Sequence, residues 1–268
     1  MLKQRVLTAL VLLPIVLAAV FASASWPFWG VTTAIVLVAS WEWTALIGWT
    51  RTKARIVYVL LSALAMLLLV AYGRLSLFHA FYALALPGWL WALQRVWRYR
   101  GEEGIFLSLS SPFLGWAVLL PAWLALNELK GLATAWLLYL FILVWGADTG
   151  AYFAGRRWGR IKLAPMVSPG KSVEGVIGGL LLTSAVAVAV AWRHPWTLTH
   201  SLAFLFLSVC TVLASVLGDL FESMLKRQRG VKDSGTIFPG HGGALDRIDS
   251  LTAAAPIFLL GWVLLGGF

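Results

Sequence analysis

Residues 137–155 read LLYLFILVWGADTGAYFAG, a strongly apolar run that leads up to a single acid, Asp148. The same high apolar content extends over the whole chain. A second run of this kind, CTVLASVLGDLFESMLK at residues 210–226, contains Asp219. Of the 268 residues, 60% are hydrophobic and 12% are charged, whereas a soluble domain carries about 25% charged residues. The composition excludes an ordinary soluble domain, and lipid is the expected solvent.

Apolar runs recur along the chain with the length of helices that cross a bilayer, which need about 20 residues each. We predict about nine spans, at residues 6–24, 28–48, 56–73, 77–94, 105–127, 133–154, 174–192, 200–222 and 250–267. A lipid-exposed backbone must satisfy its own hydrogen bonds, and the alternating pattern of barrel strands is absent. The predicted fold is all-α, a polytopic membrane protein with one domain over residues 1–268.

The basic residues predict the orientation, because Lys and Arg accumulate on the cytoplasmic side of membrane proteins. All but three of the 21 lie at the N-terminus or in alternate loops, the exceptions being Arg74, Lys130 and Arg193. This distribution predicts a cytoplasmic N-terminus. It also accounts for most of the net charge of +10, so no nucleic-acid partner is expected.

The aspartates are confined to the last part of the chain. All five (Asp148, Asp219, Asp233, Asp246 and Asp249) fall in or beside the two longest cytoplasmic loops. Ionisable groups at membrane depth are costly unless they are paired, hydrated or bound to metal, so they are functional candidates. We therefore expect the active part of the molecule within about residues 135–255, facing the cytoplasm.

Two spacings point to a metal site. Asp219 and Glu222 are three residues apart, as are Asp246 and Asp249, so each pair can project from one helix face. Two such faces brought together would offer the all-oxygen set that suits Mg²⁺ or Mn²⁺ rather than zinc. The alternative for Asp246 and Asp249 is capping of the last helix, where negative charge is favourable.

Two loops carry residues suited to binding phosphate. Residues 226–243 combine Lys226, Arg227 and Lys232 with glycines at 240, 242 and 243, which let backbone N–H groups converge on an anion. The loop before residue 174 contains Ser168 and Lys171. Its GKS triplet at residues 170–172 is not a P-loop, because Pro165 replaces the required glycine and no strand is predicted before it.

These segments together carry a resemblance to a known family. They are SMLKR (223–227), KDSG (232–235), PGHGG (239–243), DRIDS (246–250), WGADTGAY (145–152), KLAP (162–165) and SPGK (168–171). In sequence and order they resemble phosphatidate cytidylyltransferases, also called CDP-diacylglycerol synthases, of the compact bacterial type. The likeness covers roughly residues 135–255, and the earlier helices match only in character.

The resemblance implies that CTP and phosphatidate give CDP-diacylglycerol and pyrophosphate in the bacterial cytoplasmic (inner) membrane, with Mg²⁺ or Mn²⁺ required and a second cation possible. It implies metal ligation by Asp219 and Asp246, with Asp249 beside them. The phosphate-binding candidates are Lys171, Lys226, Lys232, Arg227 and Arg247. Asp148 is expected to complete the site or to position a basic group. Ser168, Ser223, Gly240, Gly242 and Gly243 are expected to shape the nucleotide pocket.

Four points stay open at this stage. His241 is a candidate for direct chemistry, with stabilisation of the turn as the alternative. Glu42, an acid within an apolar run, is expected to have a structural role beside membrane-interface aromatic residues. Another lipid-linked phosphotransferase is the nearer rival function, because nothing in the sequence reads the cytosine base, and an anion transporter is the more distant one. The partners expected are CTP, phosphatidate and membrane lipid, and a homo-oligomer is possible.

Overall fold

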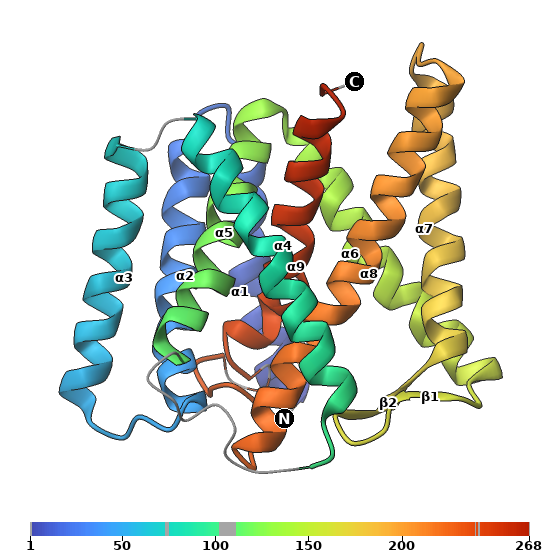
Figure 1. The fold of residues 1–268 in the computed structure, drawn as a ribbon. Coiled ribbons are helices and arrows are strands. Elements are labelled where there is room, and N and C mark those ends of the chain that lie inside the picture. The colour runs from blue at the N-terminus through green and yellow to red at the C-terminus, as the bar shows by residue number, and fades with distance from the viewer. Residues whose placement is uncertain (1, 73–74, 102–110, 239, 241, 268) are drawn as a thin grey trace.

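The computed structural model describes residues 2–72, 75–101, 111–238, 240 and 242–267, and its helices lie side by side in one bundle (Figure 1). The described helices are α1 (Leu2–Phe21), α2 (Trp26–Leu46), α3 (Thr52–Tyr72), α4 (Leu75–Arg98), α5 (Ser111–Leu132), α6 (Thr134–Trp158), α7 (Val173–Arg193), α8 (Leu198–Gln228) and α9 (Leu245–Leu264). Each predicted span coincides with one of them. The predicted start of the fifth span, residue 105, lies outside the described residues.

Two helices that carry candidate site residues extend beyond their predicted spans at the ends joined by the loop of residues 229–244. α8 continues to Gln228 rather than ending at residue 222, and α9 begins at Leu245 rather than at residue 250. Hydropathy detects only the apolar part of a helix, whereas the backbone hydrogen bonds continue into its polar ends. Lys226, which the sequence analysis assigned to a loop, is therefore helical, and Asp246 lies on the same helix as Asp249, as their spacing indicated.

The prediction of a purely helical chain needs one correction. Two short strands, β1 (Lys162–Ala164) and β2 (Ser168–Ser172), form an antiparallel hairpin between α6 and α7. Strands of this length with Pro and Gly in one of them have no recognisable alternation, which is why sequence reasoning missed them. Lys171 lies in β2, so a strand does precede α7, although Pro165 still breaks the P-loop pattern.

Within the described residues, six helices, α3 and α5 to α9, are long and apolar enough to cross a membrane. In the most apolar stretch of α5, 67% of the residues are buried inside the structure, whereas in that of α3 only 17% are buried. The outer face of α3 is covered with exposed leucines, as expected for a helix that borders lipid. The chain is thus a polytopic helical membrane protein with α5 near its centre.

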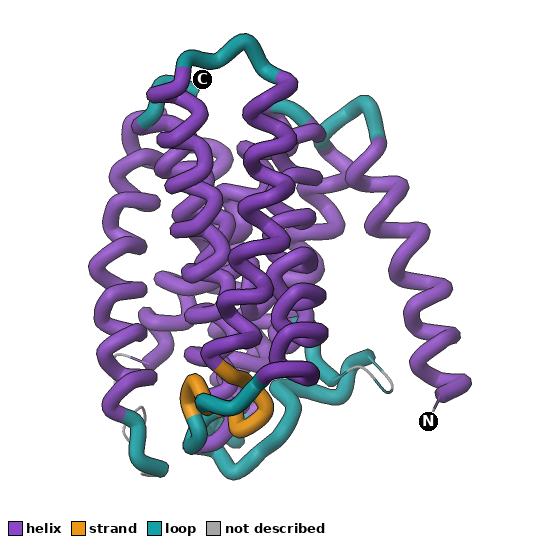
Figure 2. Tube along the Cα trace, turned by 90° about the vertical axis from the view of Figure 1, so that its right-hand side faces the viewer, coloured by secondary structure: helices purple, strands orange, loops and turns teal. Residues whose placement is uncertain are grey.

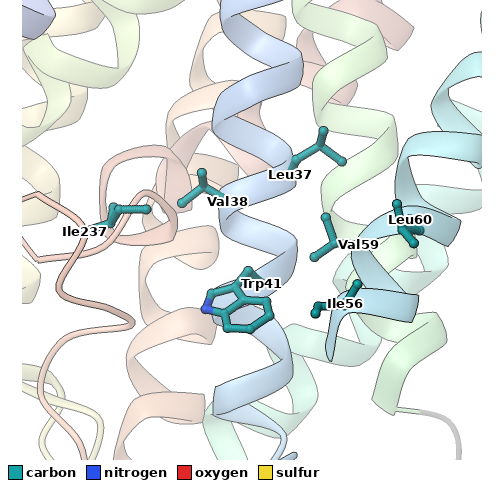
Figure 3. Close-up of a pocket in the computed structure, with 7 residues that line it drawn as sticks. All are labelled: Leu37, Val38, Trp41, Ile56, Val59, Leu60 and Ile237. Carbon is teal, nitrogen blue, oxygen red and sulfur yellow. The ribbon is translucent and has the colours of Figure 1, made fainter. Parts of the chain in front are cut away.

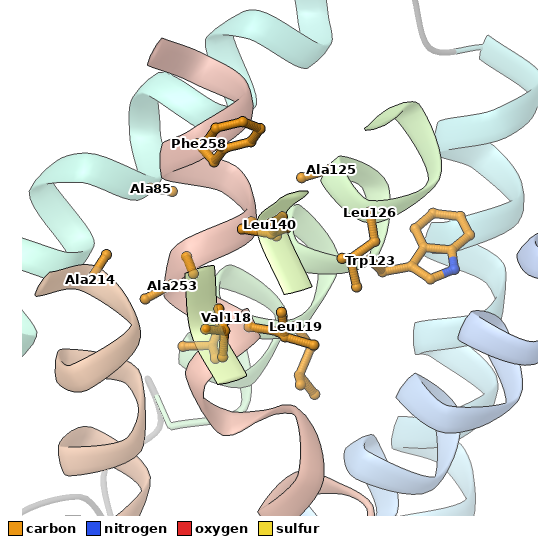
Figure 4. Close-up of a cluster of buried hydrophobic side chains, with 14 of the residues drawn as sticks. Ala85, Val118, Leu119, Trp123, Ala125, Leu126, Leu140, Ala214, Ala253 and Phe258 are labelled. Atoms are coloured by element: carbon orange, nitrogen blue, oxygen red, sulfur yellow. The ribbon is translucent and has the colours of Figure 1, made fainter. Parts of the chain in front are cut away.

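The core lies where α5, α6 and α9 meet. Figure 4 shows Leu119 of α5, Leu140 of α6 and Phe258 of α9 within this cluster, and all three side chains are fully buried. α9 also packs along α8, the closest helix pair after α6 and α7. The β-hairpin and the loop from α8 to α9, residues 229–244, lie at the same end of the bundle (Figure 2).

Candidate functional site

The first half of the site is a contact between the hairpin and α8. The Lys171 ammonium forms an ion pair with Asp219 Oδ2, and Ser223 Oγ donates to Asp219 Oδ1 over 3.2 Å. The hairpin is held in place because Ser172 caps α7, its Oγ accepting from Gly175 N at 3.2 Å. The sequence analysis assigned Lys171 to a loop. In the structure Lys171 lies in β2, and its side chain contacts Asp219 of α8, 48 residues later in the chain.

The second half joins α8 to α9. Lys226 Nζ lies 2.7 Å from Asp246 Oδ1 and 3.4 Å from Glu222 Oε1, and all three side chains are largely buried. One lysine therefore balances carboxylates from two helices. Since buried charges need partners, removing this ammonium would leave two acids uncompensated.

The glycine-containing loop folds onto the other oxygen of Asp246. Asp246 Oδ2 accepts hydrogen bonds from Ser234 N at 2.9 Å, Ser234 Oγ at 3.0 Å and Gly243 N at 2.8 Å. Gly242 has a φ of 80°, a conformation that other residues rarely adopt, and a Cβ there would lie 2.6 Å from Asp246 Oδ2. The N–H groups of the loop thus converge on an anion, as the sequence predicted, but that anion is Asp246.

Asp249 completes a row of acids between the two halves. Its Oδ1 accepts from Ser250 N at 2.7 Å, and its carboxylate interacts electrostatically with Asp219 on one side and Glu222 on the other. The close approach of α8 and α9 depends on Gly218, where a Cβ would lie 2.4 Å from Asp249 O. A larger residue at this position would push Asp219 and Asp249 apart.

Asp148 extends the row on α6. It interacts electrostatically with both Lys171 and Asp219. Asp148 and Lys171 line a hollow of about 190 Å³, whose opposite wall is apolar and includes Val212 and Val216 of α8. The sequence expectation that Asp148 lies beside a basic group is met by Lys171.

The remaining candidates are spread around this cluster. Lys232 and Arg247 are exposed, and Arg227 Nε donates to the Val167 carbonyl in the hairpin turn at 3.2 Å. Arg227 therefore contacts the hairpin, and its assignment to phosphate binding stays a prediction. Ser168 lies in β2 and Gly240 adopts a positive φ of 79° in the exposed loop. His241 lies outside the described residues.

The acids outnumber the bases in this cluster, which bears on the predicted metal. Among the described residues, Asp148, Asp219, Glu222, Asp246 and Asp249 interact with two lysines, Lys171 and Lys226. Glu222 is 3% exposed, and within the described part of the chain neither of its oxygens accepts a hydrogen bond, although Oε1 lies 3.4 Å from Lys226 Nζ. A carboxylate set with more acids than bases fits a hard divalent cation.

The described residues do not, however, form a finished metal site. No group of three acidic, histidine or cysteine side chains among them has the arrangement of metal ligands. Both oxygens of Asp246 already accept hydrogen bonds, and so do both oxygens of Asp219, from Lys171 and Ser223. Asp249 Oδ2 and both oxygens of Glu222 accept none of the described hydrogen bonds. Among the acids, Asp249 and Glu222 are therefore the ones best placed to hold a cation, and Asp219 interacts with Asp249.

Sequence reasoning missed the role of Glu42. This side chain of α2 is 3% exposed and accepts hydrogen bonds from Ser234 Oγ, Ala244 N and Leu245 N. It therefore contacts the loop that surrounds Asp246. An acid in an apolar run was the only available signal, and it did not identify the partner, which lies about 200 residues later in the chain.

Comparisons with known proteins give the same kind of protein each time, a cytidylyltransferase. The sequence model of the Cytidylyltransferase family matches residues 3–265. A phosphatidate cytidylyltransferase from Pseudomonas aeruginosa is 44% identical over 261 residues, covering 96% of each chain. One from Haemophilus influenzae is 42% identical over 285 residues, covering 96% of this chain and 97% of its own. One from Staphylococcus haemolyticus is 45% identical over 122 residues, or 46% of each chain.

Proposed function

The chain belongs to the cytidylyltransferase family, and from that premise we propose that it transfers CMP from CTP to phosphatidate, giving CDP-diacylglycerol and pyrophosphate. The observation that carries the proposal is the meeting of two lysines, Lys171 and Lys226, with carboxylates of α8 and α9 at one end of the bundle. A phosphate-binding charge and a cation-binding acid set are both needed to join two anionic reactants.

The reaction balances without a strong base. An oxygen of the lipid phosphate forms a bond to the α-phosphorus of CTP, and the bond between that phosphorus and the bridging oxygen breaks, so pyrophosphate leaves with the electron pair. Because the nucleophile is already anionic near neutral pH, positioning and charge neutralisation dominate. Lys171 and Lys226 would each exchange a carboxylate for a substrate phosphate oxygen, which keeps the ammonium groups paired.

A divalent cation such as Mg²⁺ or Mn²⁺ would be held by Asp219, Asp249 and Glu222. When bound, it would neutralise phosphate charge and polarise the α-phosphorus. Asp219 and Asp246 are predicted ligands on the same condition: Asp219 gives up its bond to Lys171 or to Ser223, and Asp246 gives up its bond to Lys226 or to the loop. Chelation of the cation is expected to abolish turnover, and readdition of Mg²⁺ to restore it.

The acyl chains of the lipid would lie in a hollow of about 600 Å³ between α1, α2 and α6. Its walls are almost wholly apolar and include Leu17, Val31 and Phe141. Arg247, next to Asp246 in sequence, lies at the α9 side of the hollow. An apolar groove that ends on a guanidinium matches a lipid with an anionic phosphate.

The proposed topology is nine spans with the N-terminus and the site on the cytoplasmic face of the bacterial inner membrane. α1 begins at the end of the bundle that carries the hairpin and the loop of residues 229–244 (Figure 1). The basic residues of those two connections support this orientation through the positive-inside rule.

The deciding experiment uses purified protein in detergent with Mg²⁺, phosphatidate and each of the four labelled nucleoside triphosphates in turn. We expect CDP-diacylglycerol and pyrophosphate from CTP. Transfer of a γ-phosphate to the lipid would instead identify a phosphotransferase. Solute flux in sealed vesicles with no lipid product would identify a transporter, and either result would overturn the proposal.

A further inference from the structure

Glu42 caps a helix to which it does not belong. α9 begins without a cap of its own, since its N-cap residue Ala244 has no side-chain hydrogen bond to offer. Glu42 Oε1 accepts from Ala244 N at 3.0 Å, and Oε2 accepts from Leu245 N at 2.8 Å. A carboxylate at a helix N-terminus satisfies otherwise unpaired N–H groups and is favoured by the helix dipole.

The same carboxylate is linked to Asp246 through Ser234. Ser234 Oγ lies 3.0 Å from Glu42 Oε2 and 3.0 Å from Asp246 Oδ2. A hydroxyl has one proton to donate, so Ser234 can serve only one of the two carboxylates at a time. Glu42 and Asp246 are thus coupled through one shared donor.

The loop backbone is shaped around Glu42. A Cβ at Gly235 would lie 2.4 Å from Glu42 Oε1, and a Cβ at Gly243 would lie 2.4 Å from Glu42 Oε2. Both approaches are shorter than real Cβ contacts, so any side chain at these positions would displace the carboxylate or the loop. Two glycines of the motif region therefore serve this contact rather than a phosphate.

α2 is itself held firmly at this end. The Arg55 guanidinium stacks over the Trp41 ring at 3.8 Å, and it donates to the Trp41 carbonyl and to Thr44 Oγ. Ile237 of the loop lines an apolar hollow with Trp41 and residues of α2 and α3 (Figure 3). Glu42 is thus a fixed point against which the loop is held.

We propose that Glu42 is a positioning residue for the transfer reaction. It holds Ser234, Gly235 and residues 243–245 so that Asp246 meets Lys226 and Asp249 stays against α8. The inference rests on the proposed function for its catalytic consequence. Its structural part, the hydrogen bonds to the start of α9, can be measured without any substrate.

The test compares Glu42→Ala and Glu42→Gln with Lys130→Met. Lys130 is a matched control because its Nζ also makes three hydrogen bonds, two of them to a distant segment, at Val20 O and Ala22 O, and the third to the nearby Thr134 Oγ. Hydrogen exchange of the Ala244 and Leu245 amides and the kcat for CTP are measured in all variants. Thermal unfolding in detergent is followed alongside.

We expect Glu42→Ala to speed exchange at Ala244 and Leu245 by about tenfold. We expect its kcat to fall by about 10²-fold, the cost of a small misplacement of catalytic groups. Glu42→Gln keeps one acceptor oxygen, and its kcat should fall between those of Glu42→Ala and the wild type. Lys130→Met should lower the unfolding temperature while its kcat stays within about twofold of the wild type.

The inference is overturned if Glu42→Ala leaves both the exchange and kcat within about twofold of the wild type. It is also overturned if Lys130→Met lowers kcat as much as Glu42→Ala, since the effect would then follow stability alone. A wild-type protein without transferase activity would refute the proposed function. The exchange rates of Ala244 and Leu245 would still decide whether Glu42 holds the loop.

Discussion

Glu42 and Lys130 are buried charged side chains that join distant segments at opposite ends of the bundle. Glu42 accepts from N–H groups at the start of α9, whereas Lys130 donates to the carbonyls of Val20 and Ala22 where α1 ends. Each charge has the sign that complements its helix terminus. The difference lies in what is attached: α9 carries Asp246 and Asp249, and the end of α1 carries no candidate site residue.

The two contacts have the same local chemistry but different roles in the molecule. Both contacts satisfy backbone groups that would otherwise be buried without partners. Only the one at Glu42 continues, through Ser234, Asp246 and Lys226, into a row of charged groups. Changes at the site end should therefore reduce turnover, and changes at the far end should reduce stability alone.

The largest effect is expected for Asp219→Ala, which removes the partner of Lys171 and a central member of the acid row. We expect kcat to fall by about 10³-fold, because charge stabilisation supplies most of the catalysis in phosphoryl chemistry. Turnover of labelled CTP measures it, with Asp233→Ala, an exposed aspartate of the loop, as control. If Asp219→Ala retains turnover, the row of acids around Asp219 and Asp249 is not the active site.

Lys226→Met should come next, with a fall in kcat of about 10²-fold. It should also destabilise the protein by about 3–5 kcal/mol, because Asp246 and Glu222 lose their common buried partner. Unfolding in detergent measures the loss, against Lys53→Met at an exposed position of α3. A variant as stable as the wild type would mean that the two acids are not held charged by Lys226.

A pair of glycine substitutions sharpens the contrast between the two ends. Gly235→Ala should lower kcat by about tenfold, because its Cβ would lie 2.4 Å from the Glu42 carboxylate. Gly131→Ala, next to Lys130, meets nothing within 4 Å. We expect it to leave kcat unchanged. Equal activities of the two variants would show that the fit around Glu42 does not matter for turnover.

The smallest effect on turnover is expected for Lys130→Met. Loss of its hydrogen bonds leaves the Val20 and Ala22 carbonyls unpaired at a cost of about 1–3 kcal/mol. Thermal unfolding should reveal this cost while kcat is unchanged. A large fall in kcat would erase the distinction between the two ends of the molecule.

Much of the fold could be predicted because the lipid solvent imposes a length and a composition on each helix. The run of residues 137–155 lies in α6, as its apolar composition predicted, and Asp148 on that helix interacts electrostatically with Lys171. The three-residue spacings of Asp219 with Glu222 and of Asp246 with Asp249 fall within α8 and α9. The apolar run and these two spacings are local, so a single segment of sequence contains each of them.

Other features were beyond sequence reasoning for identifiable reasons. The β-hairpin was not predicted because its strands are too short to show the alternation of polar and apolar residues that identifies a strand. The loop glycines were predicted to let N–H groups converge on a phosphate, whereas in the structure the N–H groups of Ser234 and Gly243 donate to Asp246 of the same chain. The sequence offered no means of telling an internal carboxylate from a substrate phosphate, because both accept the same hydrogen bonds.

The sequence by itself determined that this is a helical membrane protein, where its helices lie, and that its acids and phosphate-binding candidates gather in one part of the chain. These properties follow from hydropathy and short spacings, which act within one helix. Only the tertiary structure decided which charges meet. The pairing of Lys171 with Asp219 and of Glu42 with the start of α9 depends on how helices far apart in sequence pack, and no local pattern encodes that packing.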